Sequence, residues 1–261
     1  MIQSQYDDRF GGTARLYGTD GYQRLKAAHV CVVGIGGVGS WAAEALVRTA
    51  VGRITLIDMD EICVTNTNRQ IHAMEGNIGR SKVDVMAERL QLINPECQVN
   101  PINDFITKST VKEYITTDMT FVIDAIDSVA SKASLIGHCN RNKIKIVTTG
   151  GAGGQIDPTQ VTVGDLNKTF NDPLARKVRS QLRRYYGFSR NPKRTYGIPC
   201  VYSSEQLRYP KPDGTVCQSK SVLEGGSRLD CAGGFGAATM VTATFGFAAA
   251  AKVIEKIIQR K

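Results

Sequence analysis

Short apolar runs alternate with helical patterns along the first 150 residues of the chain. Four runs have the length and composition of buried strands, and they lie at 29–34, 53–57, 119–124 and 144–149. Apolar residues recur between and after them at helical spacing, which predicts helices over 37–50, 80–93 and 128–142. Strands that alternate with helices favour a Rossmann-like, doubly wound α/β fold. In such a fold a mainly parallel sheet carries helices on both faces.

The pattern changes after Gly150. A glycine-rich run at 150–154 predicts a loop, and a further helix is expected near 172–186. Residues 187–230 are rich in Gly, Pro, Ser and charged side chains, so we expect them to be largely irregular. Helical spacing returns over 237–258. The second part of the chain is therefore expected to combine two helices with a long irregular region.

Residues 232–251 carry no charge over about the length that a bilayer requires. The segment is mostly Ala, Gly and Thr, which insert into membranes more weakly than Leu and Ile do. We expect a buried helix of small residues that packs on the sheet, and the alternative is membrane association. The sequence shows no secretory signal, and its seven cysteines include no C-x-x-C pair. This pattern is typical of a cytoplasmic protein in a reducing compartment.

Positive charge is concentrated in the second half of the chain. Residues 1–130 hold 12 Lys and Arg against 16 Asp and Glu, whereas residues 131–261 hold 21 against 8. Residues 176–194 alone contain eight basic side chains, three aromatic ones and no acid. Basic groups neutralise phosphates and aromatic rings stack on unpaired bases, so this segment favours RNA as a partner. The alternative is a solvated helix face whose aromatic side chains turn into the core.

A glycine-rich turn follows the first expected strand, where Gly34, Gly36, Gly37 and Gly39 form the pattern G-x-G-G-x-G. Such glycines permit a tight turn and close approach of the backbone to a phosphate. The first N–H groups of the next helix can bind that phosphate. Asp58 ends the second strand, where a carboxylate can accept hydrogen bonds from ribose hydroxyls. The turn and Asp58 alone are compatible with NAD, FAD, S-adenosylmethionine or ATP.

Polar residues that follow Asp58 in the sequence favour a nucleoside triphosphate as the ligand. Asn66, Arg69 and Gln70 come soon enough after the second strand to fold back over the turn. Arg69 can hold phosphate oxygens with two parallel hydrogen bonds, and Lys82, in the first turn of the next helix, supplies a point charge. Two cations and a metal suit phosphoryl or nucleotidyl transfer, and Asp127 is the candidate ligand for Mg²⁺. The alternative is a set of surface ion pairs, each worth under ~1 kcal/mol.

These positions resemble a known family. The residues that match the adenylation domain of the ubiquitin-activating-enzyme superfamily are the run 34–40, Asp58 with Asp60, the motif 66–70, Lys82 and Asp127. Bacterial members of that superfamily adenylate sulfur-carrier proteins. The segments 9–18, 148–159 and 230–239 are similar to one branch, the tRNA threonylcarbamoyladenosine dehydratases. The resemblance implies a single adenylating domain over 1–261, with an ATP-binding half at 1–150 and a basic half for substrate binding and dimerisation at 151–261.

The resemblance also implies roles for the matching residues. Asp58 would bind ribose, Asn66, Arg69 and Lys82 would hold the phosphates of ATP, and Asp127 would hold Mg²⁺. An N-terminal arginine would reach the ATP site of a partner subunit in a homodimer. Arg9 and Arg15 both match, and we prefer Arg15, although the spacing leaves both open.

The implied reaction is the ATP-dependent dehydration of threonylcarbamoyladenosine in tRNA to its cyclic form. ATP would adenylate the threonyl carboxylate and release pyrophosphate, because hydroxide is a poor leaving group. A nitrogen of the same modification would then attack the activated carbonyl and release AMP. The implied partner is a tRNA and not DNA.

A cysteine forms a covalent intermediate in many superfamily members, and Cys231 roughly matches that position. We count Cys231 among the candidate catalytic residues, and the alternative is a small buried side chain, since intramolecular ring closure requires no thiol. The zinc-binding C-x-x-C pairs of sulfur-carrier-activating relatives are missing. Two further functions stay open: an adenylating enzyme for a ubiquitin-like sulfur-carrier protein, and a sulfur-relay protein that works with a cysteine desulfurase.

Overall fold

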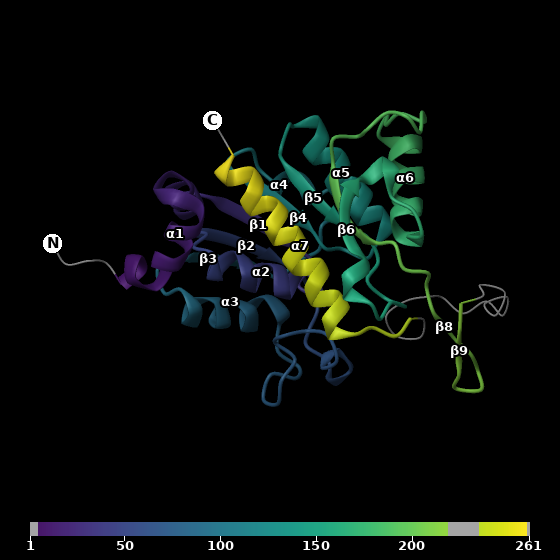
Figure 1. The fold of residues 1–261 in the computed structure, drawn as a ribbon, viewed down its shortest axis with the longest axis horizontal. Helices are drawn as coiled ribbons and strands as arrows, with labels where there is room; N and C mark the ends of the chain where they lie inside the picture. Colours follow the sequence, from purple (N-terminus) through teal and green to yellow (C-terminus); the bar gives the residue numbers. More distant parts are fainter. Residues whose placement is uncertain (1–4, 219–234, 260–261) are drawn as a thin grey trace.

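The computed structural model describes residues 5–218 and 235–259 (Figure 1). Its main sheet has the strand order β3-β2-β1-β4-β5-β7-β6. The strands are β1 (His29–Val33), β2 (Arg53–Ile57), β3 (Gln98–Ile102), β4 (Phe121–Asp124), β5 (Ile146–Thr149), β6 (Val161–Asp165) and β7 (Pro199–Ser203). Neighbouring strands are parallel except β6 and β7, which are antiparallel. The expected α/β fold with a mainly parallel sheet is confirmed.

Helices cover both faces of the sheet. One face carries α2 (Gly39–Arg48), α3 (Lys82–Ile93) and α7 (Thr239–Ile258), and the other carries α4 (Val111–Tyr114), α5 (Val129–Arg141) and α6 (Pro173–Tyr185). Alternate residues of a strand point to opposite faces. Val30 and Val32 of β1 accordingly pack with the first group, while Cys31 and Val33 pack with the second. Figure 1 shows α7 lying diagonally across the strands.

The sequence pattern does not predict the first helix, α1 (Gln5–Lys26). This helix is glycine-rich and is broken by a non-helical conformation at Gly18, with φ of 74°, which weakens its helical signal. Leu25 near its end accepts a hydrogen bond from the Gly52 N–H, just before β2. Arg24 donates to the Ile258 carbonyl at the end of α7. Helix α1 therefore packs at the amino ends of the strands (Figure 1).

Every expected strand and helix is present, with ends displaced by no more than two residues. Residues 187–218 are largely irregular, as expected, but they also contain β7, which lies inside the sheet, and β8 (Tyr209–Pro210), which pairs with β9 (Val216–Cys217). The rest of that expectation, 219–230, lies outside the described residues. Strands β3 and β6 also went unpredicted. Both are edge strands with half-exposed side chains, and β3 contains a proline, so neither has the continuous apolar run of a central strand.

Helix α7 is the buried helix of small residues that its composition predicted. Val241, Phe245 and Ala249 are fully buried in the core below it. A Cβ at Gly246 would lie 2.5 Å from the Val38 carbonyl oxygen, so glycine allows the close approach of α7 to α2. Within the described part of the chain, no helix is long and apolar enough to cross a bilayer.

Candidate nucleotide site

The carboxyl ends of β1, β2 and β4 meet around the glycine turn. Gly34 has φ of +87°, and its N–H donates to the Ile57 carbonyl at 2.8 Å. A Cβ at Gly34 would lie 2.8 Å from the Ala125 carbonyl oxygen, and one at Gly39 would lie 1.8 Å from the Gly34 carbonyl oxygen. The N-cap of α2, Val38, provides no side-chain cap. No side chain therefore caps the first N–H groups of this helix, and apart from the Ser40 N–H, which donates to the Gly36 carbonyl at 3.1 Å, they can bind an anion.

Asp58 lies beside this turn, as predicted. Its Oδ2 accepts the Ile35 N–H at 2.6 Å, and its Oδ1 accepts the Asp60 N–H at 2.9 Å. Burial raises the pKa of the Asp58 carboxyl, while the charge of Lys82 and the two N–H bonds lower it. Each carboxylate oxygen can accept a second hydrogen bond. Asp58 therefore shapes the turn and keeps acceptor capacity for ribose hydroxyls.

The loop after β2 folds over the turn. The only tryptophan of the chain, Trp41, donates to the Arg69 carbonyl at 3.0 Å, and a Cβ at Gly37 would lie 3.1 Å from Arg69 Cγ. Nη1 of Arg69 donates to the Thr65 carbonyl at 2.8 Å and to Asn68 Oδ1 at 3.0 Å. Its Nε and Nη2 form no hydrogen bond within residues 5–218 and 235–259. The guanidinium group thus retains donors for a phosphate.

Asn66 and Gln70 are buried in the same loop. Asn66 Oδ1 accepts the Cys63 N–H at 3.0 Å, which stabilises the short helix η1 (Val64–Asn66). Gln70 packs near Gly36, and its Oε1, like the hydroxyl of Ser40 next to the turn, is buried with no hydrogen-bond partner among the described residues. Unpartnered buried polar atoms are rare in folded proteins. A polar ligand in the turn would supply the missing partners.

Lys82 begins α3 and is only 6% exposed. Its Nζ donates to Asp60 Oδ2 at 2.7 Å, and its N–H donates to the Asp60 carbonyl at 3.1 Å. An ammonium group has three donors, so this ion pair leaves capacity for a phosphate. Buried Glu44 of α2 accepts a hydrogen bond from Arg89 Nε of α3 at 2.8 Å. This contact holds α3, and Lys82 with it, against α2.

Two aspartates after the Phe-Val-Ile run of β4 have different surroundings. Asp124 is fully buried, accepts from Lys132 Nζ at 3.0 Å and accepts from the Thr148 hydroxyl at 2.6 Å. Lys132 Nζ also donates to the Ile126 carbonyl at 2.9 Å. Asp127 is exposed at the carboxyl end of the sheet. Asp124 therefore stabilises the end of β4, and Asp127 is the carboxylate that solvent and ions can reach.

Two buried carboxylates that the sequence analysis did not single out hold the glycine-rich loop after β5. Asp172 is the N-cap of α6, and its carboxylate accepts the Ala175 N–H at 2.8 Å and the Gly151 N–H at 3.0 Å. Burial raises the pKa of this carboxyl. Glu205 accepts the Ile156 N–H at 3.0 Å. Asp172 before a proline is an N-cap signal that the sequence carries. Glu205 has no local signal, because its partner is distant in the chain.

The segment that leads into α7 joins the two loops. Asn68 Nδ2 donates to the Ala237 carbonyl at 2.9 Å, and the Gly154 N–H donates to the Gly236 carbonyl at 2.8 Å. The loop after β2, called the nucleotide loop below, and the glycine-rich loop after β5 thus lie at the same edge of the molecule. Cys231 lies outside the described residues, so its role stays a prediction.

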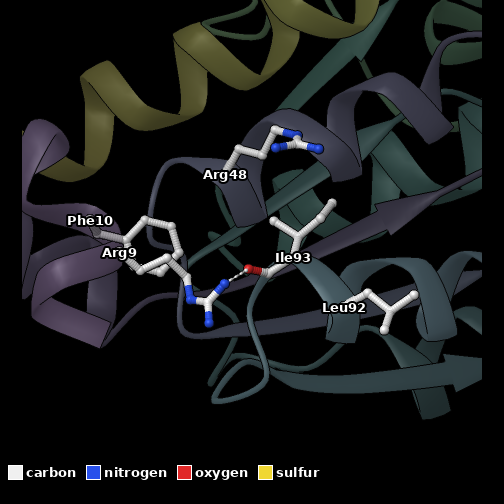
Figure 2. Close-up of a pocket in the computed structure, with 5 residues that line it drawn as sticks. All are labelled: Arg9, Phe10, Arg48, Leu92 and Ile93. Carbon is white, nitrogen blue, oxygen red and sulfur yellow. Dashed lines mark hydrogen bonds between the residues drawn. The ribbon is translucent and has the colours of Figure 1, made fainter. Parts of the chain in front are cut away.

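The two N-terminal arginines lie at the opposite edge. Arg9 donates to the Ile93 carbonyl at 3.0 Å, at the end of α3 (Figure 2). Helix α3 starts at the nucleotide edge with Lys82, so Ile93 marks the amino edge of the sheet. The hollow around this contact has a volume of about 330 Å³, and its lining consists of Arg9, Phe10, Arg48, Leu92 and Ile93. Arg15 is exposed on the same helix. The structure therefore does not bring either arginine to the glycine turn of its own chain.

Comparison with known proteins identifies the family. The ThiF family matches residues 12–261. The chain is 58% identical over 260 residues to the tRNA threonylcarbamoyladenosine dehydratase of Escherichia coli, covering 100% of this chain and 97% of the relative. It is 54% identical over 256 residues to that of Haemophilus influenzae, covering 98% and 95%.

A solved structure gives the same result. The crystal structure of the E. coli tRNA N6-threonylcarbamoyladenosine dehydratase, TcdA, in complex with ATP has a TM-score of 0.86 and 54% identity, covering 98% of this chain and 96% of that chain. The resemblance inferred from the motifs is thus confirmed. The chain belongs to the ThiF family and, within it, to the branch of the tRNA threonylcarbamoyladenosine dehydratases.

Proposed function

We propose that this protein dehydrates threonylcarbamoyladenosine in tRNA to its cyclic form at the expense of ATP. The observation that carries the proposal is the convergence of Asp58, Arg69 and Lys82 on one glycine turn, in a chain similar over its whole length to the dehydratases. The E. coli relative is known in complex with ATP. The unpartnered buried atoms of Gln70 and Ser40 fit a polar ligand in the same place.

Each residue of the turn has a role that its surroundings allow. Asp58 accepts hydrogen bonds from the ribose hydroxyls, and the N-terminus of α2 meets a phosphate. Arg69 and Lys82 share the charge of the remaining phosphates, which is largest when pyrophosphate leaves. Asn66 stabilises the loop that carries Arg69 through its Oδ1, and its Nδ2 would donate to a phosphate, as the resemblance implies.

The chemistry of the donors fits Mg²⁺ bound together with a triphosphate. Mg²⁺ commonly takes one or two carboxylates plus phosphate oxygens. Asp127 is such a carboxylate, exposed at the nucleotide edge, and the described residues contain no cluster of three or more metal-binding side chains. Asp127 would therefore hold the ion only with ATP present. The bound ion would add positive charge beside the phosphates.

The reaction has two steps. In the first, an oxygen of the threonyl carboxylate attacks the α-phosphorus of ATP, the bond to pyrophosphate breaks, and an acyl-adenylate forms. In the second, a nitrogen of the modification attacks the activated carbonyl carbon and loses its proton, and AMP leaves. The net change is the loss of one water from the modified nucleoside. The second step is intramolecular, so positioning alone can provide a large rate advantage.

We also propose a homodimer in which the partner subunit's Arg15 completes the site. The support is that α1 packs at the amino edge, so Arg15 cannot approach the turn of its own chain. Mixing the Arg15→Ala and Lys82→Ala proteins tests this. Each alone should be inactive, and the mixture should regain activity, because a mixed dimer contains one intact site. A mixture that stays inactive would contradict the trans contribution, and Arg9→Ala in place of Arg15→Ala tests the other arginine.

Mass spectrometry of nucleosides tests the function directly. The full chain is incubated with tRNA that carries threonylcarbamoyladenosine, ATP and Mg²⁺. The mass of one water should be lost from the modified nucleoside. Lys82→Ala and Arg69→Ala should abolish the loss, whereas Arg80→Ala, whose side chain pairs with Glu88, should not. An unchanged nucleoside, with ATP–pyrophosphate exchange stimulated instead by a Gly-Gly-tailed protein, would move the function to sulfur-carrier adenylation.

A further inference from the structure

Helices α5 and α6 pack together on the face of the sheet opposite α7 (Figure 1). A second hollow lies against these two helices. Its volume is about 320 Å³, and its lining consists of Val129, Lys177, Ser180, Gln181, Arg184 and Tyr185. The positions 177, 180, 181 and 184 are one face of α6, because helical neighbours are three or four residues apart. The opposite face holds the helix in the core through Ala175, Val178 and Leu182.

The hollow is positively charged and has an aromatic wall. Tyr185 is 55% exposed, and the Nζ of Lys108 and the Cζ of Arg184 lie 5.9 Å and 5.1 Å from its ring centroid. None of the described residues that line the hollow is a carboxylate. Among the described residues, none of the ion pairs includes Lys177 or Arg184. No carboxylate of the described residues thus competes with a ligand for Lys177 and Arg184, and the half-exposed ring of Tyr185 is bordered by Lys108 and Arg184.

Two other basic residues of the same helix, Arg179 and Arg183, are held by hydrogen bonds within the fold. Arg183 donates to the Tyr196 hydroxyl at 2.8 Å and to Asn167 Oδ1 at 2.7 Å, and Arg179 bonds to Thr169. These contacts hold the helix against the segment that precedes it and, through Tyr196, against the loop that follows it. Two basic residues of α6 therefore have a structural role, and two others, Lys177 and Arg184, line the hollow.

The hollow is close to the proposed adenylation site. Val129 starts α5 and follows Asp127 by two residues, a separation of at most about 8 Å along the backbone. A ligand in the hollow would extend from the nucleotide edge of the sheet. The volume is at the lower end of the range of about 300–1,000 Å³ for small-ligand pockets, which suits one nucleoside and not a duplex.

We propose that this hollow binds a single unstacked nucleotide of the substrate RNA, next to the modified adenosine. Its base would stack on Tyr185, and its neighbouring phosphates would contact Lys177 and Arg184. Single-stranded RNA is recognised by stacking on aromatic side chains beside basic groups. The inference rests on the proposed function, because that function makes the loop of a tRNA the substrate. An acidic protein partner would use the charge but would not require the ring.

Binding of a labelled anticodon stem-loop RNA to the full-length protein tests the proposal without requiring catalysis. Tyr185→Ala should weaken binding about 5- to 150-fold, the range for one stacked base, whereas Tyr185→Phe should bind as the unchanged protein does. The double variant Lys177→Gln/Arg184→Gln should reduce the salt-dependence slope by about 0.7 for each lost phosphate contact. Arg141→Gln, at the far end of α5, is the control and should leave binding unchanged.

An abasic series in the RNA loop isolates the stacking. One abasic position should lower the affinity of the unchanged protein and make the Tyr185→Ala change silent, since both remove the same contact. The proposal would be overturned if Tyr185→Ala kept the RNA affinity of the unchanged protein, or if only the Lys177→Gln/Arg184→Gln variant lost affinity. Thermal unfolding of each variant identifies misfolding, in which case Tyr185→Leu replaces the alanine variant.

The two proposals can fail separately. Cyclisation of threonylcarbamoyladenosine by the unchanged protein, with full RNA affinity in Tyr185→Ala, would leave the function intact and overturn the nucleotide subsite.

Discussion

Replacing Lys132 by methionine is the sharpest test of how the end of β4 is held. Lys132 and Asp124 are 1% and 0% exposed, and the ammonium group contacts the Asp124 carboxylate at 3.0 Å. It also donates to the carbonyls of Asp124 at 3.2 Å and Ile126 at 2.9 Å. Methionine keeps a similar apolar length and removes all three contacts. The carboxylate is then left buried without its counter-charge.

Removing one partner of a buried ion pair costs about 3–5 kcal/mol of unfolding free energy. The hydrogen bonds to Asp124 from the Thr148 hydroxyl and the Ile126 N–H remain, so we expect a loss near the lower end, about 3 kcal/mol. Urea unfolding of Lys132→Met against the unchanged protein measures it. The same change at exposed Lys112 is the control and should stay within about 0.5 kcal/mol.

The loss should depend on pH in a defined direction. Burial already raises the pKa of the Asp124 carboxyl, and the charge of Lys132 opposes that shift. Without Lys132 the folded-state pKa rises further above the unfolded value. The carboxyl then takes up a proton on folding, and stability falls as pH rises through the folded-state pKa. The variant should therefore lose more at about pH 8 than at about pH 5.5.

The double variant Asp124→Asn/Lys132→Met should recover most of the lost stability, because no charge remains buried. A loss for Lys132→Met below about 1 kcal/mol, or one equal at both pH values, would refute the assignment of a charged buried pair. ATP affinity should fall as well, since the freed Ile126 carbonyl precedes Asp127 directly.

Further predictions concern the glycine turn and the histidine behind the nucleotide loop. Gly39→Ala should destabilise the fold by about 1–3 kcal/mol, because its Cβ meets backbone at 1.8 Å. A Cβ at Gly36 would lie 3.8 Å from its nearest neighbour, Gln70 Nε2, so Gly36→Ala should lower only the affinity for ATP. Equal melting temperatures of the Gly39→Ala and Gly36→Ala proteins would contradict this difference. Burial, then Lys82 and Arg89, lower the pKa of His72 to about 4. As the pH falls, His72 takes up a proton at a higher pH in the unfolded chain than in the folded protein. The free energy of unfolding should therefore fall by up to about 3 kcal/mol between about pH 6.5 and pH 4. His72→Phe should flatten this acid limb in urea unfolding, and an unchanged slope would reject the shift.

Much of the nucleotide edge could be predicted from the sequence because its signals are local. A glycine turn directly after an apolar run specifies a strand, a tight turn and a helix N-terminus within eleven residues, 29–39. Asp58, Arg69 and Lys82 follow the carboxyl end of the next strand. Carboxyl ends of parallel strands meet at one edge, so the topology brings these side chains together. The family motifs then narrowed the ligand to ATP and the substrate to a modified tRNA.

Only the tertiary structure decided which neighbours satisfy each polar group. The pairing of Asp124 with Lys132, the hold of Trp41 on the Arg69 carbonyl and the support of the glycine-rich loop by Glu205 join residues whose sequences carry no mutual signal. Packing also decided which basic residues of α6 are hydrogen-bonded within the fold and which are accessible to a ligand. It placed α1 at the amino edge, away from the turn. These outcomes depend on burial and on contacts between distant segments, and those arise only when the sheet and its helices assemble.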